Sequence, residues 1–305
     1  MNRHQRAIAA LFLTLYPIAS LYPIASHAQG LETSGQVELE FLRGNDASTT
    51  LLSGDVMLRY RSGSFGGELG TDADFALDGG GEFKSIYAAA LFGTPFGEFA
   101  IGAPESAADL LIDVPSFAGM KGIDAGGLLP GQPVTLGTPS VVGAIAKGED
   151  RQSYGLRFSG SSGDIRYGAS IHRFDGSDTT ILQGAAEYTF GQTQIEGMIE
   201  NASLEGGFSG LIGVAHDQGQ YSVSAYLSRQ TITADGTTFQ LNGDYRLSDS
   251  LTIGGSFARK DFGTEQYLYG VTAGWGFGNG AYLSGGIADG DDTGLLMDAS
   301  VGYKF

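Results

Sequence analysis

The sequence predicts an all-β protein: a 16-stranded antiparallel transmembrane β-barrel with one long loop folded into its interior. Three observations predict this class. Most of the chain alternates polar and apolar residues with a period of two, an aromatic residue returns near the end of every second predicted strand, and the stretch 103–150 interrupts this pattern. No segment after the first thirty residues is apolar over the length that a membrane helix needs.

Residues 1–28 are predicted to be a cleaved signal peptide. Arg3 and Arg6 give a positively charged start, and the apolar core that follows is lengthened by two copies of L-Y-P-I-A-S. The triplet S-H-A then supplies a small-x-small cleavage site. The alternative is a retained membrane anchor. The prolines in the apolar core argue against it, because proline disrupts a helix. Residues 29–305 contain no linker and are predicted to form one domain.

Period-two alternation defines the strands. In 35–41 the apolar Val, Leu and Phe at odd positions alternate with Gln and Glu at even positions. The same alternation occurs in 55–61, 239–246 and 267–277. Alternation places apolar side chains on one face of a sheet and polar side chains on the other, which a soluble sandwich would also require.

A repeat separates the barrel from the sandwich. Four segments end alike: E-Y-T-F-G (187–191), D-Y-R-L-S (244–248), G-W-G-F-G (274–278) and G-Y-K-F (302–305). Their ends recur in units of roughly 29 residues, which is enough for two strands, a short turn and a longer loop, and eight such units give sixteen strands. Aromatic rings repeated at one height are typical of a membrane–water interface. The predicted interface residues are Tyr188, Phe190, Tyr245, Trp275, Phe277, Tyr303 and Phe305.

The stretch 103–150 is predicted to fold into the barrel lumen and narrow it. Prolines at 104, 115, 130 and 139 exclude a row of ladder strands there. An insert of this length within a compact β domain is normally functional. A disordered external loop is the alternative interpretation.

Composition excludes several other functions. The formal net charge of −17 argues against nucleic-acid binding, and the absence of cysteine excludes disulfides and thiol chemistry. After removal of the leader only His172 and His216 remain, and no G-x-S-x-G motif occurs, so an enzyme is not expected. No cofactor is expected either; the alternative is Ca²⁺ bound at acidic loops. The carboxylates concerned are Asp72, Asp74 and Asp78, and Asp289, Asp291 and Asp292.

Taken together, these features resemble the general diffusion porins of Gram-negative bacteria, in particular the Rhodobacter-type porins of α-proteobacteria. The likeness is carried by F-G-E-F-A-I-G (96–102) leading into the insert, by the position of the insert between the fifth and sixth strands, and by the ending D-A-S-V-G-Y-K-F. The resemblance implies an outer-membrane barrel surrounded by lipid and lipopolysaccharide, a homotrimer, and an inward-folded third loop. It also implies that carboxylates of this loop face basic residues on the opposite wall.

The expected function is a water-filled channel for passive diffusion of small hydrophilic solutes and ions, with a mild cation preference. The loop carboxylates expected at its constriction are Glu105, Asp109, Asp113 and Asp124. The basic residues expected on its wall are Arg59, Arg61, Arg151, Arg157 and Arg166, which alternation places inward. A substrate-selective channel with a saturable site and a non-conducting structural or adhesive barrel are the alternatives.

Overall fold

The computed structural model describes residues 30–44, 48–78, 81–121, 140–148, 151–203, 207–232, 235–291 and 294–305. These residues form sixteen strands, three short helical segments and their connections. The strands are β1 (Leu31–Arg43), β2 (Ser48–Ser62), β3 (Phe65–Ala76), β4 (Gly81–Thr94), β5 (Gly97–Ala103), β6 (Ser153–Ser162), β7 (Ile165–Phe174), β8 (Thr180–Phe190), β9 (Thr193–Ala202), β10 (Phe208–Asp217), β11 (Tyr221–Gln230), β12 (Gly236–Arg246), β13 (Leu251–Asp261), β14 (Glu265–Gly276), β15 (Ala281–Gly290) and β16 (Leu296–Lys304).

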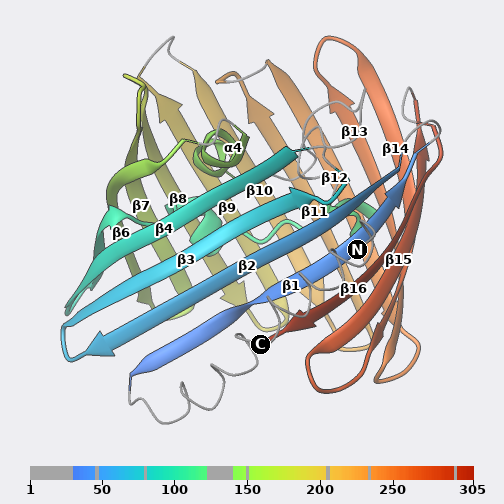
Figure 1. The fold of residues 1–305 in the computed structure, drawn as a ribbon, viewed down its shortest axis with the longest axis horizontal. Helices are drawn as coiled ribbons and strands as arrows, with labels where there is room; N and C mark the ends of the chain where they lie inside the picture. The colour runs from blue at the N-terminus through green and yellow to red at the C-terminus, as the bar shows by residue number, and fades with distance from the viewer. Residues whose placement is uncertain are drawn as a thin grey trace, which may run out of the picture.

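The strands close into one barrel in which every strand pairs antiparallel with its neighbours in sequence (Figure 1). The first and last strands complete the ring, with Val37 of β1 opposite Tyr303 of β16. Because both edges are paired, no backbone ladder is left open to the surroundings. The 16-stranded antiparallel barrel predicted from the sequence is therefore confirmed.

The two faces of the wall differ in chemistry as the alternation predicted. Ile199, Ile212 and Val271 point outward and are 62 %, 58 % and 60 % exposed, whereas polar residues such as Glu200 and Gln240 point inward and are buried. An apolar outer band around a polar interior is the pattern of a barrel whose outside is solvated by lipid. In the described part of the chain, no helix has the length and apolar character needed to span a membrane.

The seven predicted interface aromatics all lie at the end of the barrel where the short turns are. They stand in the last turn-side positions of β8, β12, β14 and β16 or directly after them. Tyr188 stacks on Phe190 with 5.7 Å between ring centroids, and Tyr303 stacks on Phe305 at 6.2 Å. The chain termini of the described part, Gly30 and Phe305, lie at this same end, and Phe305 exchanges backbone hydrogen bonds with Gly35 of β1.

The connection between β5 and β6, residues 104–152, is called the inner loop here. It contains α2 (Ala107–Leu111), η1 (Phe117–Gly119) and α4 (Val141–Gly148), so its described part is made of short helical segments and not of ladder strands. Short helices form because each can bury an apolar side against the barrel wall, a packing partner that a local reading of the sequence does not reveal. α4 lies inside the ring of strands in Figure 1.

Two acidic clusters expected in long loops are partly in strands. Asp72 and Asp74 belong to β3, where they pair in register with Asp55 and Ser53 of β2, and Asp289 belongs to β15. Asp72 and Asp74, two residues apart, follow the inward polar row of β3, whereas Asp289 is exposed on the side of β15 that carries Ile287. Asp292 and the predicted signal peptide lie outside the described residues. Among the described residues, no group of three or more potential ligands is arranged to hold a metal ion.

Candidate functional site

The inner loop enters the lumen through α2, whose amino end is held by the wall. Ser106 caps the helix by accepting from the Asp109 backbone N–H at 3.1 Å. The next free donors are satisfied by inward residues of two strands: the Ala107 N–H donates to Ser170 of β7 and the Ala108 N–H to Gln183 of β8. These bonds fix the position of the helix because buried backbone donors require partners.

α4 is fixed by a carboxylate from the wall. The Val141 N–H donates to both carboxylate oxygens of Glu200 on β9, at 3.1 and 3.0 Å, and Ser140 accepts from the Gly143 N–H. A negative charge at a helix amino terminus is favoured by the helix dipole. Gln183 donates to Glu200 at 2.7 Å and thus links the amino ends of α2 and α4 through the wall.

Apolar contacts hold the loop along most of the barrel circumference. Ala108, Leu111 and Ile112 pack against a cluster on β8–β11, and Val141, Val142 and Ala146 pack against Phe174, Ile181 and Ala202. A third cluster buries Phe117, Ala118 and Met120 against the inner face of β13–β16 and β1. The described part of the loop therefore covers the wall from β6 round to β16 and reaches β1 at Leu42. It leaves 32–38 of β1 and 55–59 of β2 facing the open lumen.

The seat of η1 depends on two glycines. A Cβ atom added at Gly286 would lie 2.2 Å from the Ala118 carbonyl oxygen, and one added at Gly270 would lie 2.5 Å from the Ala118 Cβ. These inward positions on neighbouring strands form a recess into which the loop backbone fits. Ala118 itself has a φ of 52°, a conformation held by its burial and by the bond from its N–H to Ser256.

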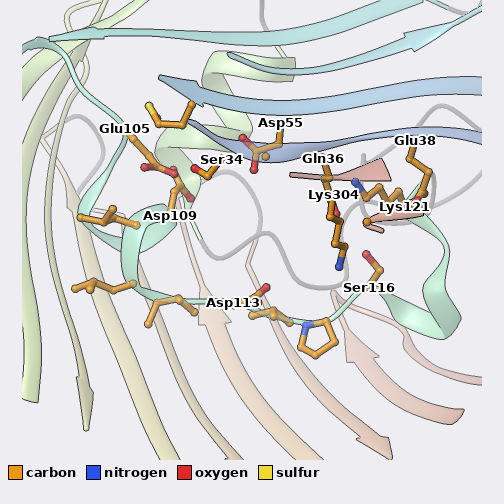
Figure 2. Close-up of a pocket in the computed structure, with 18 of the residues that line it drawn as sticks. Ser34, Gln36, Glu38, Asp55, Glu105, Asp109, Asp113, Ser116, Lys121 and Lys304 are labelled. Atoms are coloured by element: carbon orange, nitrogen blue, oxygen red, sulfur yellow. The ribbon is translucent and has the colours of Figure 1, made fainter. Parts of the chain in front are cut away.

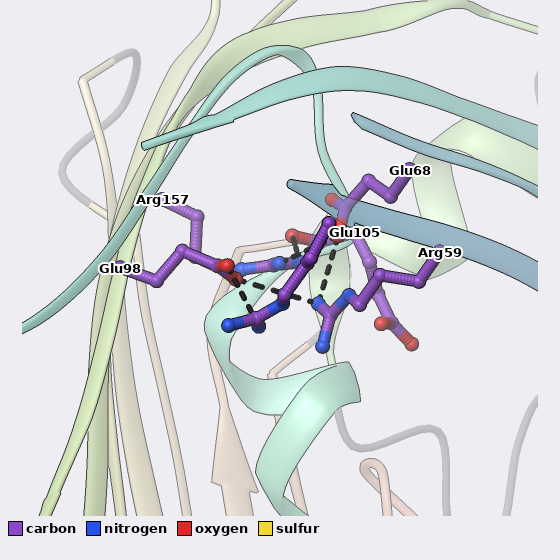
Figure 3. Close-up of polar contacts among 6 residues, drawn as sticks. Arg59, Glu68, Glu98, Glu105 and Arg157 are labelled. Carbon is purple, nitrogen blue, oxygen red and sulfur yellow. Dashed lines mark hydrogen bonds and ion pairs between the residues drawn. The ribbon is translucent and has the colours of Figure 1, made fainter. Parts of the chain in front are cut away.

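Arg157 on β6 anchors the start of the loop (Figure 3). Its guanidinium donates to the Glu105 carbonyl oxygen at 3.1 Å and to the Glu68 carboxylate of β3 at 2.9 Å. The side chains of Arg157 and Glu68 are both fully buried. Such a pair is held by geometry and by mutual neutralisation, since either charge alone would be strongly destabilising in this position.

The ion pairs continue from Glu68 toward the short-turn end of the barrel. Arg59 donates to Glu68 at 2.8 Å and lies 3.7 Å from Glu98 (Figure 3). Arg61 pairs with Glu98 at 2.7 Å. The basic residues of this wall are thus matched by carboxylates of the same wall.

A water-accessible cavity of about 1250 Å³ lies between the loop and the β1–β2 wall (Figure 2). Seven carboxylates line it and four cationic groups, a formal excess of three negative charges. The carboxylates are Glu32, Glu38, Asp55, Glu105, Asp109, Asp113 and Glu187, and the cationic groups are Arg59, Lys121, Arg166 and Lys304. Its many charged lining groups and its open shape suit the passage of water and small solutes rather than the tight burial of one ligand.

The structure brings five of the nine predicted residues to this cavity: Glu105, Asp109 and Asp113 of the loop and Arg59 and Arg166 of the wall. Arg61 is not among the lining residues and pairs with Glu98 instead. Arg157 does not line the lumen, because the loop covers it completely. Arg151 is not on a strand, because β6 begins only at Ser153. Asp124 lies outside the described residues.

Sequence reasoning missed the acidic and lysine groups of the facing wall. Glu38 and Asp55 border the cavity opposite the loop, so the wall there is not predominantly basic. Lys304, which the sequence placed only in a terminal motif, reaches the same cavity. Its position between two outward-facing residues, Tyr303 and Phe305, would have indicated an inward direction by alternation.

Two loop carboxyls titrate near neutral pH. Burial raises the pKa of the Glu105 carboxyl to about 8, and the neighbouring Asp109 adds to this rise. Burial also raises the pKa of Asp109 to about 7, against the hydrogen bond from Ser106 that lowers it. Both groups are therefore neutral in weak acid and ionised in weak base.

The raised pKa values of Glu105 and Asp109 predict that an ion current through the cavity shifts toward cations as pH rises. Because the two pKa values are raised to about 7 and about 8, deprotonation adds two negative charges to the cavity as pH rises through this range. The reversal potential in a KCl gradient should shift toward cation preference over the same interval. The double variant Glu105→Gln, Asp109→Asn should lose most of this pH dependence, whereas Asp178→Asn, in an exposed ion pair with Arg173 far from the cavity, should keep it. An unaltered pH profile in the double variant would contradict the assignment.

A closed transmembrane barrel with an inward loop and an acid-lined aqueous cavity defines the class of the protein. No protein-family model matches the sequence. No curated protein matches it either. Several solved structures, in contrast, match the fold of this chain. A triple mutant of the Rhodopseudomonas blastica porin superposes with a TM-score of 0.67 at 15 % sequence identity, covering 90 % of this chain and 100 % of the porin.

Two further structures give the same result. A quintuple mutant of the R. blastica porin matches with a TM-score of 0.66 at 14 % identity, again over 90 % of this chain and all of the porin. A structure concerned with asymmetric conductivity of engineered proteins matches with a TM-score of 0.63 at 14 % identity over the same shares. The chain therefore has the porin fold that the resemblance in the sequence predicted.

Proposed function

We propose that the protein is an outer-membrane channel of a Gram-negative bacterium through which small hydrophilic solutes and ions diffuse passively, with a mild cation preference. The observation that carries this proposal is the acid-lined cavity of about 1250 Å³ inside a closed barrel with an apolar exterior. The apolar band requires a lipid surrounding, and the polar interior requires water. Bilayer lipid and lipopolysaccharide are then its immediate partners.

The inner loop is the constriction in this proposal. Its described part is anchored by hydrogen bonds to β6, β7, β8, β9 and β13 and by three apolar clusters, so it narrows the lumen as a fixed partition. Selectivity in such a pore follows from the charges that border the narrow section. An excess of carboxylates there favours cations.

Purified protein in planar lipid bilayers tests the proposal. Single-channel steps with a reversal potential that indicates a cation preference are expected. Absence of conductance in properly folded barrels would support the structural or adhesive alternative instead. An anion preference would be consistent with a channel but would refute the inference that the excess carboxylates favour cations.

Neutralising two carboxylates of the loop is expected to weaken cation preference at a pH above about 7, where Asp109 is ionised. Asp109→Asn with Asp113→Asn removes two negative charges from the cavity while keeping side-chain size. The cation-to-anion permeability ratio should fall by about twofold, since charges in water-filled pores are strongly screened. The matched control is Asp178→Asn together with Asp235→Asn, two exposed carboxylates paired with arginines outside the cavity. Equal reversal potentials for the two double variants would remove Asp109 and Asp113 from the selective region.

We also propose assembly as a homotrimer, as the porin fold and the resemblance of the sequence suggest. Cross-linking of the protein in its native membrane, followed by mass determination, tests this assembly. A monomer as the largest product would contradict it.

A further inference from the structure

The cavity has two ends of opposite charge. Glu105, Asp109 and Asp55 lie together at one end, and Lys121 and Lys304 lie at the other (Figure 2). The Nζ atom of Lys304 is 5.7 Å from the centroid of the Tyr282 ring. An aqueous passage bordered in this way orients any solute that carries a positive and a negative group.

The strand register fixes the separation of these ends on the wall. Gln36 of β1 pairs with Lys304 on one side and with Asp55 on the other, and Asp55 pairs in turn with Asp72. Neighbouring strands are about 4.8 Å apart, so the backbones of Lys304 and Asp55 are separated by about 10 Å. An extended peptide advances about 3.4 Å per residue, so the charged termini of a tripeptide are about 10 Å apart.

The lining combines apolar surface with charged groups, which suits a peptide rather than a simple salt. Leu110, Val114 and Pro115 of the loop and Met57 of β2 supply this apolar surface. On the β1 wall, Glu38 is 95 % buried: Tyr282 donates to one carboxylate oxygen, and the other has no hydrogen-bond partner among the described residues. With two lysines and the Glu38 carboxylate, the lysine end carries one net positive charge.

We propose that the cavity binds short zwitterionic peptides of two or three residues, with the ammonium group at Asp55 and Asp109 and the carboxylate at Lys121 and Lys304. This inference rests on the proposed channel function and specifies its preferred solute class. Binding is weak and saturable, because both charged contacts are made in water and the peptide must leave at the other side. A free amino acid is too short to reach both ends in this arrangement.

Block of ion current by matched peptides tests the proposal on the unmodified protein. The probes are triglycine, N-acetyl-triglycine, which lacks the ammonium group, and triglycine amide, which lacks the carboxylate. Triglycine should reduce the K⁺ current saturably, and each derivative should need at least about fivefold more for half-block, which corresponds to the loss of one screened charge contact. The three peptides are compared on the unmodified protein, so the result does not depend on whether a variant folds.

Two variants assign the ends. The Lys304→Gln variant should be blocked about equally by triglycine and by its amide, because the group that contacts the carboxylate is gone. The Asp55→Asn variant should be blocked about equally by triglycine and by its N-acetyl derivative, because the group that contacts the ammonium is gone. Asp235→Asn, in an exposed ion pair outside the cavity, should retain both differences.

Three results would overturn the inference. Equal or stronger block by the amide would show a site for organic cations only. Equal block by all three peptides would show that the charged termini do not contribute to binding. Normal ion conductance without block by any peptide would exclude the peptide site and leave the channel intact. Absence of all conductance would instead refute the channel itself, so the two failures are distinguishable.

Discussion

Replacing Arg157 by alanine is expected to destabilise the barrel and to convert a steady open-channel current into one that fluctuates between levels. Arg157 holds the Glu105 carbonyl at 3.1 Å and the Glu68 carboxylate at 2.9 Å, and the side chains of both Arg157 and Glu68 are fully buried. Its loss leaves a buried carbonyl without a donor and a buried carboxylate with Arg59 as its remaining partner. The expected loss is about 3 kcal/mol in the free energy of unfolding, at the low end for breaking a buried ion pair because Arg59 remains.

Two comparisons make the expectation specific. Arg157→Lys keeps the positive charge but cannot donate to two acceptors in the geometry of a guanidinium, so it should recover only part of the stability. Arg173→Ala removes an arginine whose ion pair with Asp178 is exposed, and it should cost less than about 1 kcal/mol. The measurements are denaturant unfolding in lipid vesicles and single-channel recording. If Arg157→Ala matches Arg173→Ala in both, Arg157 does not anchor the loop.

The barrel was predictable because its rules are local. Alternation with a period of two fixes which side chains face lipid, and the recurring pairs such as Tyr188–Phe190 and Trp275–Phe277 mark one end of every second strand. Counting these units gave sixteen strands, and the structure closes with that number. Asp72 and Asp74 were misassigned to a loop because the aspartates near Gly79–Gly81 suggested turn composition, although both obey the alternation of β3.

The path of the inner loop was not predictable from local patterns. Its anchors join residues that are far apart in sequence: Ala108 with Gln183, Val141 with Glu200, and Ala118 with Ser256. Alternation shows that these wall residues point inward, but it does not show which of them meets water and which meets the loop. The same limit explains Arg157, whose inward direction was predicted but whose complete cover by the loop was not.

Inward glycines are the signal that could have located one contact. Gly270 and Gly286 lie on the inner faces of adjacent strands, where a polar side chain would otherwise meet water. Glycine at such positions often marks the close approach of another backbone. Here that backbone is residues 117–120 of the loop, which sits against the wall because both side chains are missing.

Gly286→Ala is therefore expected to push the loop into the open part of the lumen and lower the single-channel conductance. The new Cβ would lie 2.2 Å from the Ala118 carbonyl oxygen, so the two groups must separate by more than 1 Å to reach ordinary contact. The wall strand is held in its ladder on both sides by β14 and β16, so the loop is the part that yields. It can move only toward the β1–β2 side, where the cavity lies.

Gly274→Ala on β14 is the matched control, because its nearest neighbour to a new Cβ is a backbone oxygen 3.9 Å away. It should leave the conductance unchanged, whereas Gly286→Ala should reduce it by at least about a third and cost about 1–3 kcal/mol of stability through overpacking. Adding Gly270→Ala, whose Cβ would meet that of Ala118 at 2.5 Å, should increase both effects. Equal conductance in the Gly286 and Gly274 variants would mean that residues 117–120 do not border the conducting path, because a displaced partition must change the current that passes beside it.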